Sequence, residues 1–176
     1  MSTTVDTPSS GAAPTSRTAR LTGERCTICR DAEVSGIGLH FGRTCRLVFR
    51  PAPSAHGISF RRTDRAGAKA IPARVAQAVE AERRTQLGIG DEAVHTIEHV
   101  LAAVGALGID DLLIEMDGPE PPIMDGSAEP FVAALLGAGL KSNGGRPEWL
   151  VLRKPIRVAD GESPTRHVRA VACRST

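Results

Sequence analysis

The segment from Thr96 to Gly108 constrains the fold most, because it places two reactive side chains at the start of a patterned apolar run. At about 100° per residue, one arc of a helix gathers its large apolar side chains, which are Ile97, Val100, Leu101, Val104 and Leu107. Thr96 is a favoured N-cap residue, and Glu98 in the first turn suits the positive end of the helix dipole. The spacing predicts a helix that begins at Thr96, ends at Gly108 and packs its apolar arc on a sheet.

The opposite side of this predicted helix carries Glu98 and His99. Their companions on that side are small residues rather than charged ones, namely Ala102, Ala103, Gly105 and Ala106. Small residues let a second element approach closely, so the pattern predicts a helix that is covered on both sides, with a cleft at Glu98 and His99. The alternative is that Glu98 only favours the helix dipole and that His99 is a half-exposed surface group.

Length and composition limit the classes of protein. A chain of 176 residues suits one domain and part of a second. Hydrophobic residues make up 41% and aromatic residues only 3%, so a core of Leu, Ile, Val and Ala is expected. The net charge of +2 and the absence of a basic run interleaved with aromatic residues argue against a nucleic-acid partner.

Neither a membrane span nor a secretory leader is expected. No apolar run reaches the roughly 18 residues that a membrane helix requires, and the N-terminal residues lack the basic-then-apolar layout of a signal peptide. The expected localisation is therefore cytoplasmic. Cys26 and Cys29 have zinc-knuckle spacing, but Cys45 and Cys173 supply no second pair of that spacing. Reduced thiols are the favoured interpretation.

Composition divides the chain into four parts. Residues 1–20 are rich in Ser, Thr, Ala and Pro without apolar periodicity, which predicts a disordered tail. The first domain is expected over 21–142, followed by a linker over 143–148. A second unit would begin in 149–176, with strands at 149–152 and 156–158 and no clean period beyond Asp160.

Period-two alternation predicts the strands of the first domain. They are expected at 45–50, with Cys45, Leu47 and Phe49 inward, at 58–60, and at 112–116, with Leu112, Ile114 and Met116 inward. Residues 54–57 would join the first two as a hairpin, and a short strand is expected from Thr27.

A second helix is predicted from the N-cap Ser127 to Gly139, and residues 73–82 are compatible with a further helix. Three glycines over 36–42 indicate a tight turn with close backbone approach. Residues 122–127 are best explained as a structural turn, while His56 and His95 are expected to be solvent-exposed and without a role. The pattern predicts an α+β fold, a two-layer sandwich with helices on one face of a sheet.

The motifs resemble those of bacterial UDP-3-O-acyl-N-acetylglucosamine deacetylases, the zinc amidases of lipid A synthesis, over about residues 25–160. The resemblance rests on the order and content of five segments: 36–40 (GIGLH), 51–53 with 57–64, 96–100 (TIEHV), 108–110 and 122–128 (PIMDGSA). Asp111 departs from the Asn that is common in the family, and Pro121 replaces a more usual aliphatic residue.

The resemblance implies an enzyme of two such sandwich domains, of which this chain holds the first and an incomplete second. It implies that His99 is one of three zinc ligands and that Glu98 is the general base. The other two ligands would be a His and an Asp of the second domain, but His167 and its surroundings do not match a His-x-x-x-Asp pair. Leu39 and His40 would line the substrate pocket; the alternative is a strand-joining turn with His40 satisfied locally.

The implied reaction is hydrolysis of the N-acetyl group of UDP-3-O-(3-hydroxyacyl)-N-acetylglucosamine in a Gram-negative bacterium, with Zn²⁺ activating water and Glu98 taking its proton. The competing interpretation is a non-catalytic, truncated homologue that retains one domain and binds a partner, or a second copy of itself, through its uncovered helical face. A nucleic-acid-binding sandwich is a third interpretation, which the lack of a basic face disfavours.

Overall fold

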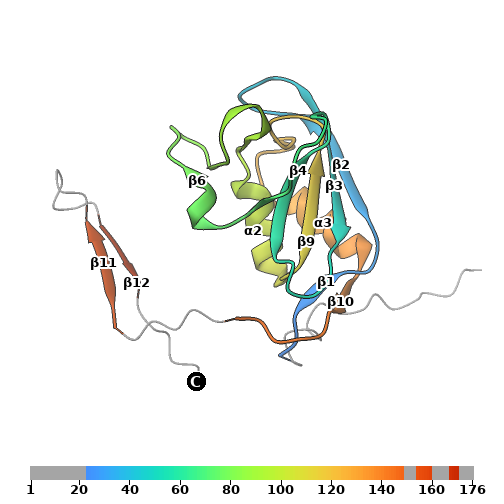
Figure 1. Ribbon diagram of the computed structural model, residues 1–176, viewed down its shortest axis with the longest axis vertical. Helices are drawn as coiled ribbons and strands as arrows, with labels where there is room; N and C mark the ends of the chain where they lie inside the picture. The colour runs from blue at the N-terminus through green and yellow to red at the C-terminus, as the bar shows by residue number, and fades with distance from the viewer. Residues whose placement is uncertain (1–22, 149–153, 160–166, 171–176) are drawn as a thin grey trace, which may run out of the picture.

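The computed structural model describes residues 23–148, 154–159 and 167–170 (Figure 1). Its main sheet has five strands in the order β2-β3-β9-β4-β5. Neighbouring strands are antiparallel except β4 and β9, which are parallel. The strands are β2 (Ala32–Ile37), β3 (Thr44–Pro51), β9 (Leu112–Met116), β4 (Ile58–Arg62) and β5 (Ile71–Pro72).

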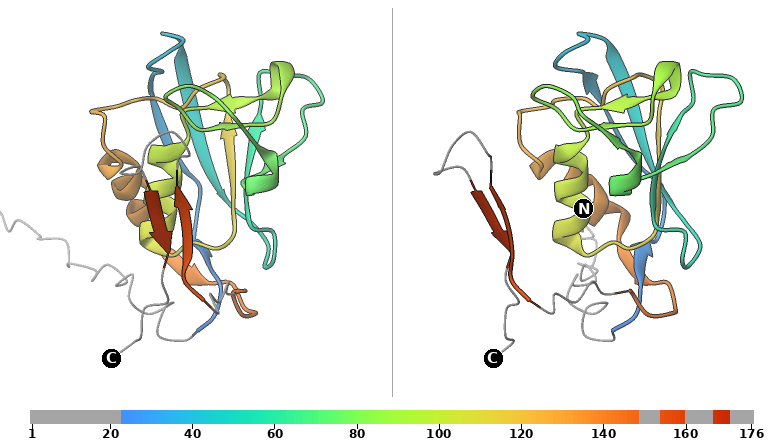
Figure 2. Two further views of the ribbon diagram at one scale, coloured as in Figure 1. Left: turned by 90° about the vertical axis from the view of Figure 1, so that its left-hand side faces the viewer. Right: turned by 60° about the vertical axis from the view of Figure 1, so that its left-hand side comes forward.

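Helices α2 (Glu98–Leu107) and α3 (Glu129–Ala138) lie together on one face of this sheet, as both views of Figure 2 show. The predicted α+β sandwich with helices on one face is therefore confirmed. No helix in the described ranges is long and apolar enough to cross a membrane.

Smaller elements surround the sandwich. Strand β1 (Cys26–Ile28) pairs antiparallel with β10 (Leu140–Ser142). Three short strands between β5 and α2 form a sheet of their own, β6 (Ala78–Val79), β7 (Gln86–Leu87) and β8 (Val94–His95). Two 3-10 turns accompany them, η1 (Val75–Gln77) and η2 (Gly90–Glu92).

A separate antiparallel pair follows, β11 (Ile156–Ala159) and β12 (His167–Ala170). The strand predicted at 156–158 is confirmed, and β12 lies where no period was recognised in the sequence. The strand predicted at 149–152 and the tail at 1–20 fall outside the described residues. Within the expected linker, Asn143 and Gly145 form backbone hydrogen bonds with Arg25, and these bonds anchor this stretch to the domain.

The core lies between the sheet and the two helices. Leu47, Phe49, Ile114 and Met116 are fully buried, as their alternation along β3 and β9 predicts. The Phe49 ring meets the Phe131 ring of α3 edge-on, with centroids 6.5 Å apart. Burial of each such side chain contributes about 1.5–3 kcal/mol to the free energy of folding, which stabilises the packing of the helices on the sheet.

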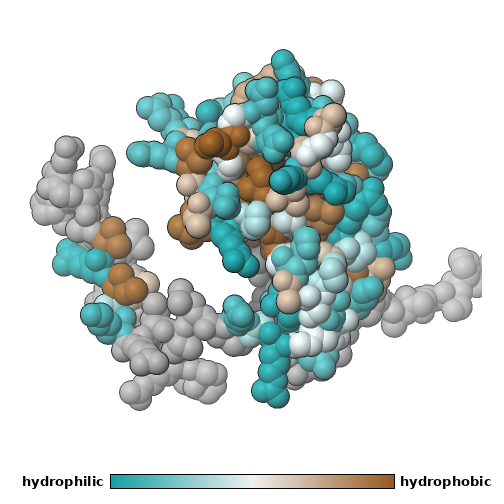
Figure 3. Space-filling model, in the orientation of Figure 1, coloured by the Kyte–Doolittle hydropathy of each residue, from teal (hydrophilic) through white to brown (hydrophobic). Residues whose placement is uncertain are grey.

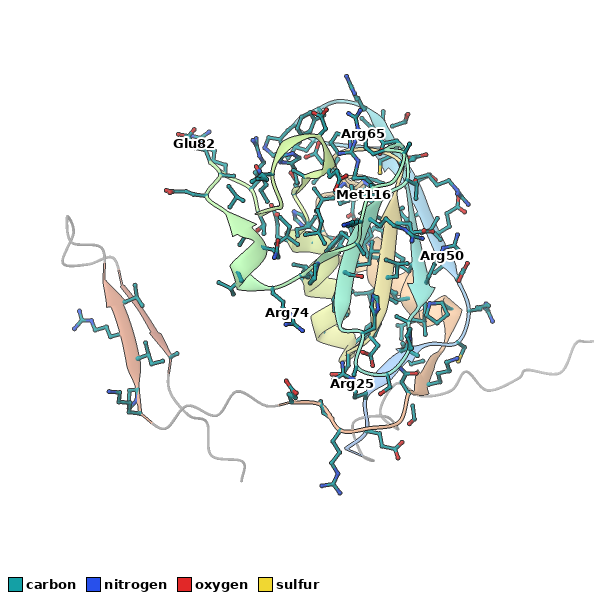
Figure 4. All side chains as sticks on the ribbon, viewed as in Figure 1. Arg25, Arg50, Arg65, Arg74, Glu82 and Met116 are labelled. Carbon is teal, nitrogen blue, oxygen red and sulfur yellow. The ribbon has the colours of Figure 1, made fainter. Side chains whose placement is uncertain are left out.

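The outer face of the sheet is polar. Arg46 pairs with Glu33, and Glu115 lies between Arg50 and Arg61 with its carboxylate paired to both. Figure 3 shows that hydrophilic side chains cover much of the surface in this view, and Figure 4 shows Arg50 pointing outward from β3. Strands that face water on one side and core on the other produce the alternation seen in the sequence.

The hairpin predicted between 45–50 and 58–60 is wrong. Strand β9 lies between β3 and β4 and pairs with both. The connecting residues 52–57 therefore cross over the end of β9, where the amide of Leu112 donates to the Gly57 carbonyl at 2.9 Å. A strand that is distant in sequence fills this gap, so local turn chemistry was no guide to the pairing.

The residues at the start of α2 differ from the prediction, while those at its end agree. The helix begins at Glu98, and no side chain caps it. Thr96 has a φ of +53°, so the predicted N-cap role is wrong. Gly108 ends the helix in the left-handed conformation, with a φ of +65°, as predicted. On its outer side Ala102, Gly105 and Ala106 are exposed, but Ala103 is buried, which corrects its assignment to that side.

Two further predictions of helices are corrected. Helix α3 begins at Glu129 rather than directly after Ser127, although the Ser127 hydroxyl accepts a hydrogen bond from the Glu129 amide at 3.1 Å. Residues 73–82 form no α-helix, but hold η1 and β6. The apolar side chain of Val75 is 91% exposed there, so no buried stripe exists to stabilise a helix.

The burial of the cysteines leads to a first testable prediction. Cys29 is exposed, whereas Cys45 is buried on β3, and burial raises the pKa of its thiol to about 12. Iodoacetamide at pH 8 should label Cys29 first and Cys45 about 100-fold more slowly, because the thiolate is the reacting form. Peptide mass mapping of labelled samples measures both rates.

A sample unfolded in urea is the control, in which the two rates should converge. Equal labelling of Cys29 and Cys45 in the folded protein would contradict the inward orientation of the Cys45 side chain.

Candidate functional site

The glycine-rich turn joins β2 to β3 at residues 38–43, where the Gly38 amide donates to the Arg43 carbonyl at 2.9 Å. Gly36 belongs to β2, so the turn is shorter than predicted. The predicted close approach is confirmed. A Cβ on Gly36 would lie 3.0 Å from the Cβ of Pro122, and one on Gly38 would lie 2.6 Å from Oε2 of Glu120.

A buried carboxylate holds the tip of this hairpin. Glu120 is 2% exposed, and its Oε2 accepts hydrogen bonds from the amides of His40 at 2.9 Å and Phe41 at 3.1 Å. The His40 Nδ1 lies 2.9 Å from Oε1. Burial favours a higher pKa, but the hydrogen bonds from Thr96, His40 and the two amides outweigh it and hold the pKa of Glu120 below its usual value. Glu120 is therefore ionised at neutral pH.

Sequence reasoning missed Glu120. Its side chain comes from the loop after β9, and its partners His40 and Phe41 lie 80 and 79 residues earlier in the chain. The available signal was an acidic residue in a run of prolines, which specifies no partner.

Thr96 also joins this cluster, since its hydroxyl lies 3.2 Å from Nδ1 of His40, the ring atom that contacts Glu120. Thr96 is 5% exposed. Its positive φ is uncommon for a β-branched residue, because the branched Cβ crowds the carbonyl in the left-handed region. The hydroxyl that was expected to cap the helix is therefore used to bind the hairpin tip.

Glu98 and His99 occupy the first turn of α2, and both are half-buried. Oε2 of Glu98 accepts a hydrogen bond from the Thr85 amide at 3.1 Å, which fixes one carboxylate oxygen. The imidazole of His99 has no hydrogen-bond partner among the described residues. The pair thus offers the Glu98 carboxylate, oriented by the Thr85 amide, and the His99 imidazole, which can bind a ligand.

The expectation that His95 is solvent-exposed is wrong. Its amide donates to the Pro119 carbonyl at 2.9 Å, and its ring packs on Phe41 with centroids 5.1 Å apart. Burial lowers the pKa of His95, so the ring is neutral at neutral pH. Its Nδ1 is buried without a hydrogen-bond partner in the described structure. His56 is exposed as expected and contacts the Ser59 hydroxyl at 2.7 Å.

A pocket of about 220 Å³ adjoins the hairpin tip, lined by Phe41, Arg43, Arg62, Arg65, Gly90, Asp91, Ala93, His95 and Pro119. The Arg62 guanidinium donates to both carboxylate oxygens of Asp64 at 2.7 and 2.6 Å. It also donates to the carbonyls of Asp91 and Ala93. The most buried cation of the pocket is therefore already neutralised and serves the local structure.

The structure brings His40 to Thr96, two residues before Glu98, so two of the predicted segments meet. Leu39 beside His40 is 59% exposed on the same hairpin tip. Within the ranges that the structure describes, no three His, Cys, Asp or Glu side chains come together as a metal site. His99 is accordingly a single candidate donor.

The sequence is similar to those of a known protein family. The family model "LpxC: UDP-3-O-acyl N-acetylglycosamine deacetylase" matches residues 25–174. The UDP-3-O-acyl-N-acetylglucosamine deacetylase of Citrifermentans bemidjiense is 46% identical over 148 residues, 81% of this chain and 48% of that protein. That of Myxococcus xanthus is 44% identical over 152 residues, 84% of this chain and 48% of the relative.

The bifunctional enzyme LpxC/FabZ of Chlorobaculum tepidum is 44% identical over 136 residues, 77% of this chain and 29% of that protein. The chain thus spans about half the length of the deacetylases that it matches, or less.

Proposed function

Because the chain belongs to the UDP-3-O-acyl-N-acetylglucosamine deacetylase family, we propose that it takes part in removing the N-acetyl group from UDP-3-O-(3-hydroxyacyl)-N-acetylglucosamine in lipid A biosynthesis. The observation that carries the proposal is the Glu98–His99 pair at the start of α2. The cytoplasm of a Gram-negative bacterium is the proposed compartment.

Glu98 is the proposed general base. The Thr85 amide orients one of its oxygens, which leaves the other to accept a proton from the attacking water. His99 is the proposed zinc ligand, and Leu39 and His40 are the proposed substrate contacts on the hairpin tip. Zinc, when bound, supplies a Lewis acid that lowers the pKa of water and polarises a carbonyl oxygen.

The donor set fits zinc in part. A half-buried imidazole without a hydrogen-bond partner among the described residues suits one coordination position, but a catalytic zinc takes three protein ligands. The other two must come from outside the described side chains or from another polypeptide. The His167 side chain is outside the described part, and the curated relatives are about twice as long as this chain.

The exposed outer side of the two helices favours a second candidate function, a non-catalytic homologue that binds a partner. Small or apolar side chains are exposed on the two helices away from the sheet, at Ala102, Ala133, Leu136 and Gly137. Such a surface suits close packing against another helical layer, either a further domain or a second copy of this chain.

Zinc content distinguishes the two functions. The purified chain and its His99→Ala variant should be compared by metal analysis, together with deacetylation of the UDP-sugar substrate, with His56→Ala as the matched histidine control. We expect stoichiometric zinc and turnover that His99→Ala removes and His56→Ala preserves. A folded chain with neither zinc nor turnover would overturn the catalytic proposal in favour of the non-catalytic one.

A further inference from the structure

We propose that Glu120 is a positioning residue, which ties the hairpin tip at His40 to Thr96 and thereby holds the substrate loop and the start of α2 in one arrangement. The inference rests on the proposed function for its catalytic meaning, since it concerns how Glu98 and His40 are held. The contacts of Glu120 with His40 can be tested without an activity measurement.

Both oxygens of Glu120 contact the hairpin tip. Oε2 accepts hydrogen bonds from the His40 and Phe41 amides, and Oε1 contacts Nδ1 of His40, which in turn lies 3.2 Å from the Thr96 hydroxyl. Within the described structure, Glu120 forms an ion pair with His40 and with no Lys or Arg. An ionised carboxylate this buried is tolerated only because these donors converge on it.

Thr96 shows what this contact holds in place. A left-handed conformation at a buried β-branched residue is strained, and it persists only where the surroundings determine it. Glu120 supplies that constraint through the His40 ring, whose Nδ1 lies 2.9 Å from Oε1 of Glu120 and 3.2 Å from the Thr96 hydroxyl. Helix α2 begins at Glu98, two residues after Thr96, and no side chain caps it. The backbone conformation of Thr96 therefore sets the direction in which the helix starts.

His40 is held in one chemical form as well as one place. An ionised carboxylate can only accept hydrogen bonds, so the Nδ1 of His40 must carry the hydrogen that points at Glu120. In the neutral ring, Nε2 is then the acceptor that His40 can offer to a substrate. Glu120 thus selects the tautomer of a residue on the substrate loop.

Gly38 provides an independent observation. A Cβ at this position would lie 2.6 Å from Oε2 of Glu120, so the hairpin accommodates the carboxylate only because residue 38 lacks a side chain. Gly38→Ala should therefore displace the same carboxylate from the other side. Gly137→Ala in α3 is the matched control, because a Cβ there meets no atom within 4 Å.

The tautomer of His40 is the test, measured by ¹⁵N-detected NMR of the imidazole in the full chain. Wild type should show Nδ1–H. In Glu120→Gln, the amide oxygen should still accept hydrogen bonds from the His40 and Phe41 backbone amides, and the new NH₂ group should face Nδ1 of His40. Because this NH₂ group donates a hydrogen bond, Nδ1 should become an acceptor and the His40 ring should change to the Nε2–H tautomer. Gly38→Ala should shift the His40 signals, and Gly137→Ala should leave them unchanged.

Wild-type His40 in the Nε2–H form would overturn the proposal without any variant, and so would an unchanged tautomer in folded Glu120→Gln. Where turnover is measurable, Glu120→Gln should lower kcat by about 10- to 100-fold with little change in KM. A change of the His40 tautomer in Glu120→Gln, in a chain that shows no turnover, would confirm the positioning role of Glu120 and refute the proposed function. Failure of the one proposal can therefore be distinguished from failure of the other.

Discussion

Glu98→Gln is expected to lower the turnover of deacetylation by about 100- to 10,000-fold, the usual contribution of a positioned general base. Glutamine keeps the size of Glu98 and an oxygen for the Thr85 amide, which donates to Glu98 at 3.1 Å. It cannot accept a proton from water. The zinc content of the variant should equal that of wild type, because Glu98 is not the proposed ligand. Single-turnover rates and metal analysis on the same samples measure both quantities.

Glu129→Gln is the matched control, since Glu129 occupies the first turn of α3 as Glu98 occupies that of α2. Both glutamates lie in the first turn of a helix, where a carboxylate favours the dipole, so a dipole role alone would make the two variants similar. Unchanged turnover in Glu98→Gln, or an equal loss in Glu129→Gln, would refute the assignment of Glu98 as the base.

Asp111→Ala is expected to lower the free energy of unfolding by about 3–5 kcal/mol, the cost of removing one partner from a buried ion pair. The Asp111 side chain is fully buried and accepts both prongs of the Arg25 guanidinium at 2.8 and 2.7 Å. It also accepts from the Gly57 amide and the Asn143 side chain. Its loss would release three segments that meet at this end of the domain.

Glu33→Ala is the matched control for this variant, because Glu33 and Arg46 form a solvent-exposed pair whose loss should change stability little. Urea unfolding measures both variants. Asp111→Asn should cost less than Asp111→Ala, since an amide oxygen can still accept from Arg25. Equal losses in Asp111→Ala and Glu33→Ala would contradict the buried network. Arg25 and Arg65 mark opposite ends of the domain in Figure 4, so this effect is separate from the pocket that Arg65 lines.

The acid sensitivity of the fold follows from the same network. Burial favours a higher pKa for Asp111, but hydrogen bonds from Arg25, Gly57 and Asn143 outweigh it and hold its pKa below the usual 3.8. The unfolded state therefore takes up the proton first as the pH falls. The stabilisation is complete at neutral pH and is lost as the pH falls through the lowered pKa, so Asp111→Ala should flatten this part of the pH profile.

The sequence by itself determined the parts of the fold that depend on near neighbours. Alternation in 45–50 and 112–116 specified which side chains enter the core, because successive side chains of a strand face opposite ways. Gly108 marked the end of α2, since glycine adopts the left-handed cap at little cost. The Glu98–His99 pair was assigned to a helix start from the apolar spacing and from the fit of Glu98 to the helix dipole, although the Thr96 cap used for the same assignment was wrong.

The tertiary structure alone decided how these pieces meet. Strand β9 enters between β3 and β4, which replaces an expected hairpin with a parallel pairing. Thr96 does not cap the helix and adopts a strained conformation, because its hydroxyl contacts the His40 ring that Glu120 holds. Glu120 can be buried and charged only where donors 80 residues away converge on it. Local periodicity carries no information about such partners, because burial and hydrogen bonding are set by residues that the folded chain alone brings together.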